Sequence, residues 1–577
     1  MKKILMMFCA SVLLASCAAI FDDDKTPVKS GEVETSYIAI NLMATDPDTR
    51  AGEGDSTDGT TEEPTPTYQD GSADERAVKT AYFFFFKDGA AFPVTVKEGA
   101  VTAPGTAQGV NFLSATLTPE NGTKPDGKVN VSDVKDVVLL LKNYKGEYPD
   151  QIIAVLNWVP VQSKSYSMED LKAVVNVQSD RGFVMSNAVF ADGAGQAVTA
   201  TPLTLANIFT TEDKAKASPV NIYVERIAAK VTVTAPESKK FDLKRDILAS
   251  ASPVKAYAVL EGWELYNELD KSCLLKQINP ETWGQDAVGF NWNDRAFFRS
   301  YWAESPIPSW NTGENYFTWD GGLGFGLKTD VDAGTYAEKT YVYCGENTTN
   351  DAAKRTKVIL KATLVGENNS PLELARWYGT EYLGEINLRT AVANTLKNTY
   401  FYKETVDGSV RYTNIDPTDL QCVVGGTTGA PDGVDATEVY FQLSTATGKG
   451  VAKDWYVYSS ADGYTALTDD ELNTKLEEVP SAVLYKGGKT YYFFDIKHLG
   501  APESRAEYGI VRNHIYNINI NSIGGYGSPV YSGTSNILTP EYPEVPTDEG
   551  SYVSAKVNIL SWRMVSQGVD IQPQPGK

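Results

Sequence analysis

The chain has 577 residues, which is too many for a single hydrophobic core, and its 42% of hydrophobic residues can fill two. Aromatic residues make up 11% and include 32 tyrosines, a composition that favours β-rich structure with amphipathic surfaces. The net charge of −22 argues against a nucleic-acid partner, because phosphates require stripes of Lys and Arg. It suits a soluble, self-repelling protein at a cell surface.

The first residues have the pattern of a bacterial secretion signal. Two lysines precede an apolar stretch over 4–14, which is too short to remain as a membrane span. Residues 14–17 read LASC, the pattern of a lipoprotein box, which predicts cleavage between Ser16 and Cys17 and acylation of Cys17. A simple secretory signal with an accidental cysteine is the alternative. Since no later segment approaches about 20 apolar residues, we expect membrane attachment through this lipid alone.

An acidic run, FDDDKT at 21–26, follows the leader. Its position close behind the lipidated cysteine resembles the surface-export signal of Bacteroidales lipoproteins, although Ala18 rather than an aspartate comes directly after Cys17. A solvated tether is the alternative reading.

The first predicted strand, 36–43, stands alone. Its apolar residues alternate with others, which is the period of a half-buried strand. The residues that share its apolar face are Ile38, Ile40 and Leu42.

A long segment, 44–75, separates this strand from the rest of the chain. It is rich in Asp, Glu, Gly, Thr and Pro and poor in apolar residues, so we expect a mobile, protease-accessible loop. One arginine, Arg50, stands before the small residue Ala51 in it.

The remaining chain reads as strands with a few short helices. Short helices are predicted over 167–175, 383–396 and 468–478. Strands are predicted over 78–89, 136–142, 151–157, 182–192, 218–236, 258–267, 340–348, 356–366, 489–497 and 513–523. We therefore predict a mainly β protein with two β-sandwich domains of transthyretin-like or Greek-key type, spanning 51–236 and 237–538. Residues 237–252 are the expected seam between them.

Motifs for catalysis or metal binding are missing from the sequence. The two histidines, His498 and His514, have no HExxH setting, and no nucleophile elbow or phosphate-binding loop occurs. The glycine-rich stretch 321–326 reads as a turn, and 330–334 lacks the later ligands of a calcium loop. We predict no catalytic residue, no metal and no cofactor.

Three cysteines follow the leader, and their odd number and wide spacing define no disulfide framework. They read as small buried hydrophobic residues, with a Cys273–Cys344 bridge as the alternative.

The C-terminal segment, 539–577, combines a linker with a terminal strand. Prolines at 540, 543 and 546 predict a stiff, extended linker before the alternating segment 551–571. Apolar residues occupy odd positions first, then even ones, then odd ones again, and each change requires a bulge or bend. The predicted contact residues are Val553, Ala555, Val557, Ile559, Trp562, Met564, Val569 and Ile571. The alternative is an ordinary last strand that folds onto its own domain.

Several stretches together resemble the fimbrillins of Bacteroidales type V pili, in particular the Mfa-type minor-fimbrium subunits, over nearly the whole chain. They are LASC at 14–17, TRAG at 49–52, FVMSNAVF at 183–190, VNIYVERIAAKV at 220–231, the WND and FFRSYWAESP segments within 292–306, CGENT at 344–348, YGIVRNHIYNINI at 508–520 and VNILSW at 557–562.

The resemblance implies a route of assembly. Fimbrillins are exported as outer-membrane lipoproteins, and an arginine-specific surface protease cuts them in the first flexible loop. The leader and first strand leave, and the terminal strand of another subunit fills the opened groove. Here Arg50–Ala51 corresponds to the cut, 17–50 to the propeptide that leaves, and 551–571 to the donor strand. The implied partners are copies of this chain, anchor and tip subunits, the protease, and outer-membrane lipid through Cys17 in the precursor.

The sequence is consistent with three functions. The first is a shaft subunit of a cell-surface fimbrium that polymerises by donor-strand exchange. Such a subunit supports adhesion and biofilm, and the sequence does not identify the receptor that it binds. The second is a surface-retained lipoprotein that binds a glycan or protein without polymerising, with aromatic residues as platforms at 455–458, Trp292, Tyr301 and Trp302. The alternative for these aromatics is that they are core and sheet residues. A surface hydrolase is the third.

Overall fold

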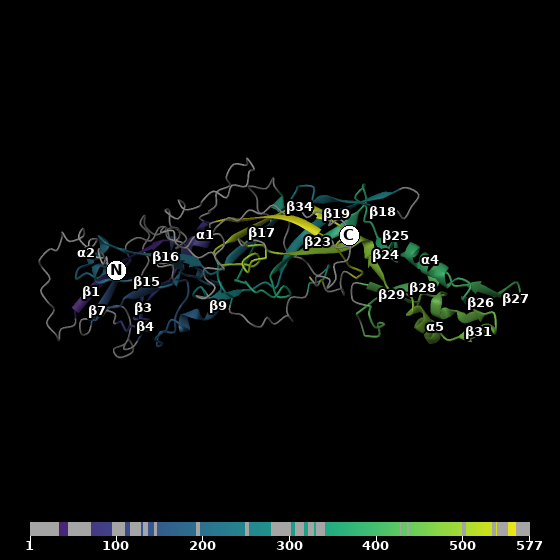
Figure 1. The fold of residues 1–577 in the computed structure, drawn as a ribbon, viewed down its shortest axis with the longest axis horizontal. Coiled ribbons are helices and arrows are strands. Elements are labelled where there is room, and N and C mark those ends of the chain that lie inside the picture. Colours follow the sequence, from purple (N-terminus) through teal and green to yellow (C-terminus); the bar gives the residue numbers. More distant parts are fainter. Residues whose placement is uncertain are drawn as a thin grey trace, which may run out of the picture.

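The computed structural model of the chain is elongated (Figure 1). One sheet with its small satellite strands occupies one end, a pair of sheets the middle, and a third group of strands with two helices the other end. The structure describes residues 34–43, 71–94, 110–115, 129–130, 137–143, 147–191, 197–247, 253–278, 302–305, 317–320, 328–329, 341–426, 428–434, 438–498, 503–532, 538, 540 and 552–560.

The N-terminal sheet has the strand order β4-β3-β8-β12-β16-β1-β7, with β15 paired to β8 and β5 paired to β3. Its strands are β1 (Glu34–Met43), β3 (Ala81–Lys87), β4 (Ala90–Ala91), β5 (Phe112–Ala115), β7 (Val137–Asn143), β8 (Gln151–Leu156), β12 (Met185–Asn187), β15 (Thr201–Pro202) and β16 (Val220–Arg226).

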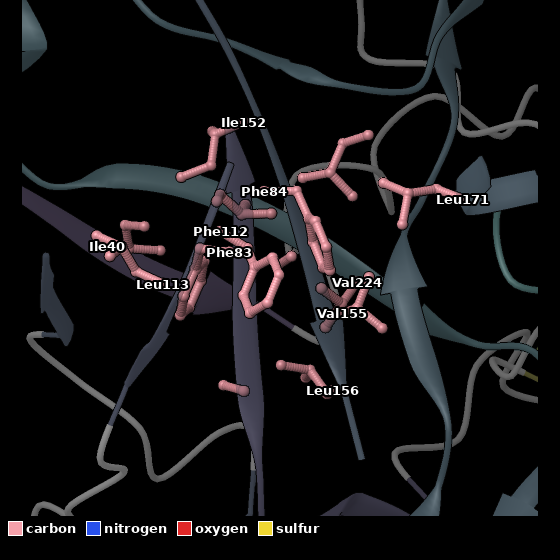
Figure 2. Packing of buried hydrophobic residues seen from close by; sticks show 14 of the residues in the cluster. Ile40, Phe83, Phe84, Phe112, Leu113, Ile152, Val155, Leu156, Leu171 and Val224 are labelled. Atoms are coloured by element: carbon pink, nitrogen blue, oxygen red, sulfur yellow. The ribbon is translucent and has the colours of Figure 1, made fainter. Parts of the chain in front are cut away.

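The core of this sheet is rich in phenylalanine. In β3, the run Phe83–Phe86 is fully buried, so this strand is covered on both faces. A continuous apolar run, rather than an alternating one, is the sequence pattern of such a strand. Figure 2 shows Phe83, Phe84 and Phe112 packed in one cluster with Ile152.

Short elements surround the N-terminal sheet. The helices are α1 (Ala73–Arg76) and α2 (Glu212–Lys216), with 3-10 turns at Asp170–Lys172 and Leu205–Asn207. The paired short strands are β2 (Ala77–Val78) with β6 (Val129–Asn130), β9 (Val174–Asn176) with β20 (Lys271–Cys273), β10 (Gln178–Ser179) with β11 (Gly182–Phe183), and β13 (Phe190–Ala191) with β14 (Ala197–Val198).

Two sheets in the middle of the molecule enclose a second hydrophobic core. The first has the order β21-β17-β34-β36 with β22 on β17, and its strands are β17 (Ala229–Ala235), β21 (Lys328–Thr329), β22 (Tyr341–Cys344), β34 (Ile515–Gly524) and β36 (Tyr552–Leu560). The second has the order β18-β19-β23-β33-β35, and its strands are β18 (Lys240–Ile247), β19 (Val254–Tyr266), β23 (Lys357–Val365), β33 (Lys489–Asp495) and β35 (Ser528–Pro529).

The far end holds a third core between two more sheets and two helices. One sheet runs β25-β24-β32-β29-β28, and the other runs β27-β26-β30-β31. The elements are β24 (Leu374–Trp377), β25 (Thr380–Leu383), α4 (Glu385–Leu396), β26 (Tyr400–Val406), β27 (Ser409–Asn414), β28 (Leu420–Val424), β29 (Glu438–Leu443), β30 (Asp454–Ser459), β31 (Gly463–Leu467), α5 (Asp469–Leu476) and β32 (Ala482–Tyr485), with 3-10 turns at Pro417–Asp419, Gly450–Ala452 and Lys486–Gly488.

The mainly β fold with few short helices is confirmed. The helices expected over 383–396 and 468–478 are present as α4 and α5, and the side chain of Thr468 caps α5 by accepting from the Glu471 amide. The helix expected over 167–175 is absent. One 3-10 turn forms there instead, and the chain then enters β9, which pairs with β20. Long-range pairing therefore overrides the local helical pattern there.

The segment expected as one strand over 218–236 is divided between two sheets. β16 lies in the N-terminal sheet, whereas β17 pairs with β34 and β22 in the middle of the molecule. The break between the sheets therefore falls at Ile227–Ala228, ahead of the boundary expected at 236. Residues 240–247 of the expected seam form β18 instead.

Buried polar contacts tie the two regions together at this break. Glu75 of α1 accepts from Lys230 Nζ of β17 at 2.8 Å and from the hydroxyl of Tyr343, and its backbone carbonyl accepts from Arg226 Nε. Burial alone would raise the pKa of Glu75, but the charge of Lys230 and these hydrogen bonds hold the pKa below its usual value.

Two further ion pairs lie completely inside the same junction. Lys276 Nζ is 2.8 Å from Glu225 Oε1, and Arg512 Nη2 is 2.5 Å from Glu346 Oε2. Arg512 also donates to the carbonyl oxygens of Cys273 and Leu274. Because a buried charge without its partner is costly, these contacts fix the orientation of the two regions.

Candidate functional site

The first strand, β1, lies inside the N-terminal sheet rather than at its edge. It pairs in parallel with β16, from Ile40 opposite Val220 to Met43 opposite Tyr223. On its other side it pairs antiparallel with β7, from Glu34 opposite Asn143 to Ile40 opposite Val137. A strand with ladders on both sides contributes hydrogen bonds in both directions across the sheet.

The side chains at the centre of β1 are part of the core. Ile38, Ala39 and Ile40 are at most 1% exposed, so both faces of the strand are covered at this point. Figure 2 shows Ile40 in the same cluster as Phe83 and Leu113. Burying an isoleucine stabilises a fold by about 1.5–3 kcal/mol, so the two isoleucines contribute about 3–6 kcal/mol.

β7 depends on β1 for its place in the sheet. Within the described ranges, β1 is the one strand that forms a ladder with β7. The helix α2 lies against both strands, with Ala215 fully buried. If β1 were removed, β16 would keep β12 but lose its neighbour on the other side, and β7 would lose its ladder, so the opening would be wider than one missing strand.

The tail strand, β36, lies at the edge of the first middle sheet. It pairs antiparallel with β34, from Ile515 opposite Leu560 to Gly524 opposite Tyr552, with a register shift between Ile520 and Ser522. In this structure the tail therefore pairs with its own molecule, as expected for an ordinary last strand.

The predicted site residues are distributed as follows. Ile38, Ile40 and Leu42 lie in β1, and Val553, Ala555, Val557 and Ile559 lie in β36. Ser16, Cys17, Arg50, Ala51, Trp562, Met564, Val569 and Ile571 lie outside the described residues. Sequence reasoning missed β7 and α2 as neighbours of β1, because such pairings join segments far apart in the chain.

The two histidines are structural. His498 and His514 are almost completely buried. Nδ1 of His498 lies 2.9 Å from the Tyr516 hydroxyl, and Nδ1 of His514 lies 2.7 Å from the carbonyl oxygen of Arg512. In the described part of the chain, no group of three or more His, Cys, Asp or Glu residues could hold a metal ion.

The three cysteines after the leader are buried, and each is a free thiol. Burial raises the pKa of the Cys273 thiol to about 11, with a further contribution from Glu346. Burial likewise raises the pKa of Cys344 and Cys422. Such thiols are unreactive, which agrees with their reading as small hydrophobic residues. Among the helices of the described residues, none is long and apolar enough to cross a membrane.

Comparison with known proteins shows a similarity in the C-terminal part of the chain. Residues 483–568, which include β33, β34 and β36, match the family described as "Major fimbrial subunit protein type IV, Fimbrillin, C-terminal". The C-terminal part of this chain is therefore similar to the C-terminal region of fimbrillins, the subunits of fimbriae. The match supports the family and does not separate the Mfa type from other fimbrillins.

Solved structures with some similarity to this chain include two proteins from Porphyromonas gingivalis. A fimbrilin (fimA) is 10% identical over 92% of this chain and 98% of its own, with a TM-score of 0.34. The tip fimbrial protein Mfa3, with a C-terminal truncation, is 10% identical over 85% of this chain and 97% of its own, with a TM-score of 0.25. Scores this low support no argument about the fold. No curated protein matches the chain.

Proposed function

We propose that this chain is a fimbrillin, and that it is a shaft subunit of a cell-surface fimbrium that polymerises by donor-strand exchange. It is exported as a lipoprotein acylated at Cys17 and is cleaved by an arginine-specific protease between Arg50 and Ala51. The leader and β1 then leave, and the tail of a second copy takes the place of β1. A tip subunit would need no donor tail, so the presence of a tail favours the role of a shaft subunit over that of a tip subunit. The fimbrium supports adhesion and biofilm.

The observation that carries this proposal is the position of β1. Arg50 follows β1 in the chain, so a cut after Arg50 removes the covalent link between β1 and everything that follows. Within the described residues, two ladders, the core contacts of Ile38, Ala39 and Ile40, and the packing of α2 would then hold β1 in place. The cleaved molecule would keep its sheet but could exchange one strand of it.

The tail has the properties required of a replacement. β36 has 9 residues and β1 has 10, and both alternate apolar with other residues. A replacement restores the ladders to β16 and β7, at about 1 kcal/mol for each net hydrogen bond, and refills the space left by the isoleucines. Since the tail of one copy enters the next copy, the contact is head-to-tail and builds a filament.

The same tail must first leave β34. In the uncut precursor the groove is filled by β1 and the tail pairs with β34, so neither half of the exchange is available. Cleavage opens the groove, and release of β36 from its edge position supplies the donor. This arrangement keeps the precursor monomeric until the protease acts.

An electrophoresis experiment tests the proposal. The purified full chain is treated with an arginine-specific protease and run without boiling on a denaturing gel. We expect a ladder of polymers that is lost in Arg50→Ala and in a chain truncated after Gly550. The matched control is Arg181→Ala, which removes a half-buried arginine in the turn between β10 and β11 and should polymerise normally. A clean monomer from the cleaved wild type, or polymers from Arg50→Ala, would refute the proposal.

A further inference from the structure

The sheet β27-β26-β30-β31 has one face toward the third core and one face away from it. Trp455 and Tyr402 point toward the core, where their rings lie 5.8 Å apart. Because side chains alternate along a strand, the residues between them project from the opposite, outer face. The aromatic residues of the outer face are Phe401, Tyr412, Tyr456, Tyr458 and Tyr464.

These five rings form one connected group. Tyr412 and Tyr464 are stacked, with centroids 3.8 Å apart and planes 4° from parallel. Tyr464 also contacts Phe401 and Tyr458, and Tyr412 contacts Tyr456. The group comes from all four strands, so the sheet fixes the positions of its rings.

The outer rings remain accessible to solvent. Phe401 is buried, whereas Tyr458 and Tyr464 are 43% and 40% exposed, and Val410, which shares this face on β27, is 56% exposed. Exposed apolar side chains gathered on one face, unlike scattered ones, mark a binding surface. We propose that this face, the tyrosine platform, binds an uncharged glycan chain.

The charge of the platform favours a neutral ligand. Among the strand residues that share its face, Lys403 and Asp454 carry charge, and they lie directly opposite each other on β26 and β30. Their charges cancel, so the face has no basic stripe for a polyanion. Tyrosine offers a flat apolar ring with a hydroxyl at its end, which suits a sugar that presents C–H groups on its face and hydroxyls at its rim.

The size of the platform argues against a protein partner. Four strands about 4.8 Å apart, with about six residues each at about 3.4 Å, cover about 400 Å². A stable protein interface needs about 800 Å² on each partner, so the platform is about half of that. A short run of sugar rings fits the area.

The platform lies at the opposite end of the molecule from the N-terminal sheet (Figure 1). Its function is therefore independent of strand exchange, and it can be tested on the uncut full chain.

Affinity electrophoresis provides the test. The full chain is run in native gels that contain mannan, dextran or arabinogalactan, and we expect at least one of them to slow its migration. Tyr458→Ser and Tyr464→Ser should each reduce this retardation at least fivefold in apparent affinity. The matched control is Tyr378→Ser, which removes a tyrosine that is 72% exposed but lies outside the platform, and it should be retarded like the wild type.

A second measurement needs no substitution and so does not depend on the folding of a variant. The retarding polysaccharide should slow nitration of Tyr458 and Tyr464 by tetranitromethane, read by peptide mass spectrometry, and leave Tyr378 unchanged. No retardation by any of the three polysaccharides would overturn the proposal, as would retardation that survives both substitutions with no protection from nitration. Loss of a self-association in the platform variants, without any glycan effect, would assign the face to a second copy instead.

Discussion

Substitution of Ile40 by alanine should weaken the precursor and leave the polymer unchanged. Ile40 is fully buried in the N-terminal core, so truncation to alanine should cost about 2–5 kcal/mol of unfolding free energy. In the proposed polymer, however, β1 is absent, and the substituted residue has left with it. The same substitution therefore has a large effect before cleavage and none after assembly.

Hydrogen–deuterium exchange of the β16 peptide reports this difference locally. Since 1.4 kcal/mol corresponds to a factor of ten, exchange in the uncut Ile40→Ala chain should be at least about 30-fold faster than in the wild type. The matched control is Ile222→Ala, a fully buried isoleucine in β16 that stays in the mature subunit. It should accelerate exchange in both the precursor and the polymer.

The reasoning fails if Ile40→Ala destabilises the polymer as much as Ile222→Ala does, because β1 would then still be present after assembly. It also fails if the uncut variant exchanges like the wild type. The cleaved Ile40→Ala chain should also polymerise at a higher rate than the cleaved wild type, because it holds β1 less tightly.

Three further predictions follow from the described contacts. Cleavage of the chain truncated after Gly550 should remove exchange protection from residues 137–143, since β7 pairs with β1 and no donor tail is present; retained protection would show that β7 has another support. Glu75→Gln should cost about 3 kcal/mol at neutral pH by leaving Lys230 without its carboxylate. The folded pKa of Glu75 lies below its unfolded value of 4.5, so the stability that its carboxylate contributes is present above pH 4.5 and is lost as the pH falls through the folded pKa. Acid unfolding, followed by circular dichroism, should therefore depend less on pH in the Glu75→Gln variant than in the wild type. The three buried cysteines should react with iodoacetamide at pH 8 only after denaturation, and rapid labelling of the native chain, measured by mass, would contradict their burial.

The sequence predicts well those elements whose pattern is local. The alternation over 36–43 predicts β1, and the apolar run at 151–157 predicts β8. The capping box at Thr468 marks the start of α5. In each case the signal lies within a few residues, where side-chain period and capping chemistry act.

The division of 218–236 between two sheets coincides with a change in the alternation of buried residues along the chain. Buried residues occupy even positions through Val224 and odd positions from Ala229. A change of phase moves side chains to the other face of a strand, so it marks the point at which the chain passes from one sheet to another.

Other features depend on contacts between distant segments and have no local signal. The pairing of β1 with β7 and β16 joins three separate parts of the chain, and the outer face of the far sheet gathers tyrosines from four strands. The segment 455–458 shows the difficulty: Trp455 enters the core while Tyr456 and Tyr458 face outward, and composition alone does not separate them. Of the other aromatics considered as platforms, Trp302 is buried, and Trp292 and Tyr301 lie outside the described residues.

Photo-crosslinking from the tail tests strand exchange most directly. A benzoylphenylalanine is placed at position 557 of a chain that is mixed with isotope-labelled copies, before and after protease treatment. In the precursor we expect crosslinks to 515–524 of the same chain, as the pairing of β36 with β34 requires. In the polymer we expect crosslinks to 137–143 or 220–226 of a different copy. Crosslinks that remain within the same chain, on 515–524, after β1 has left would contradict assembly by exchange of the tail.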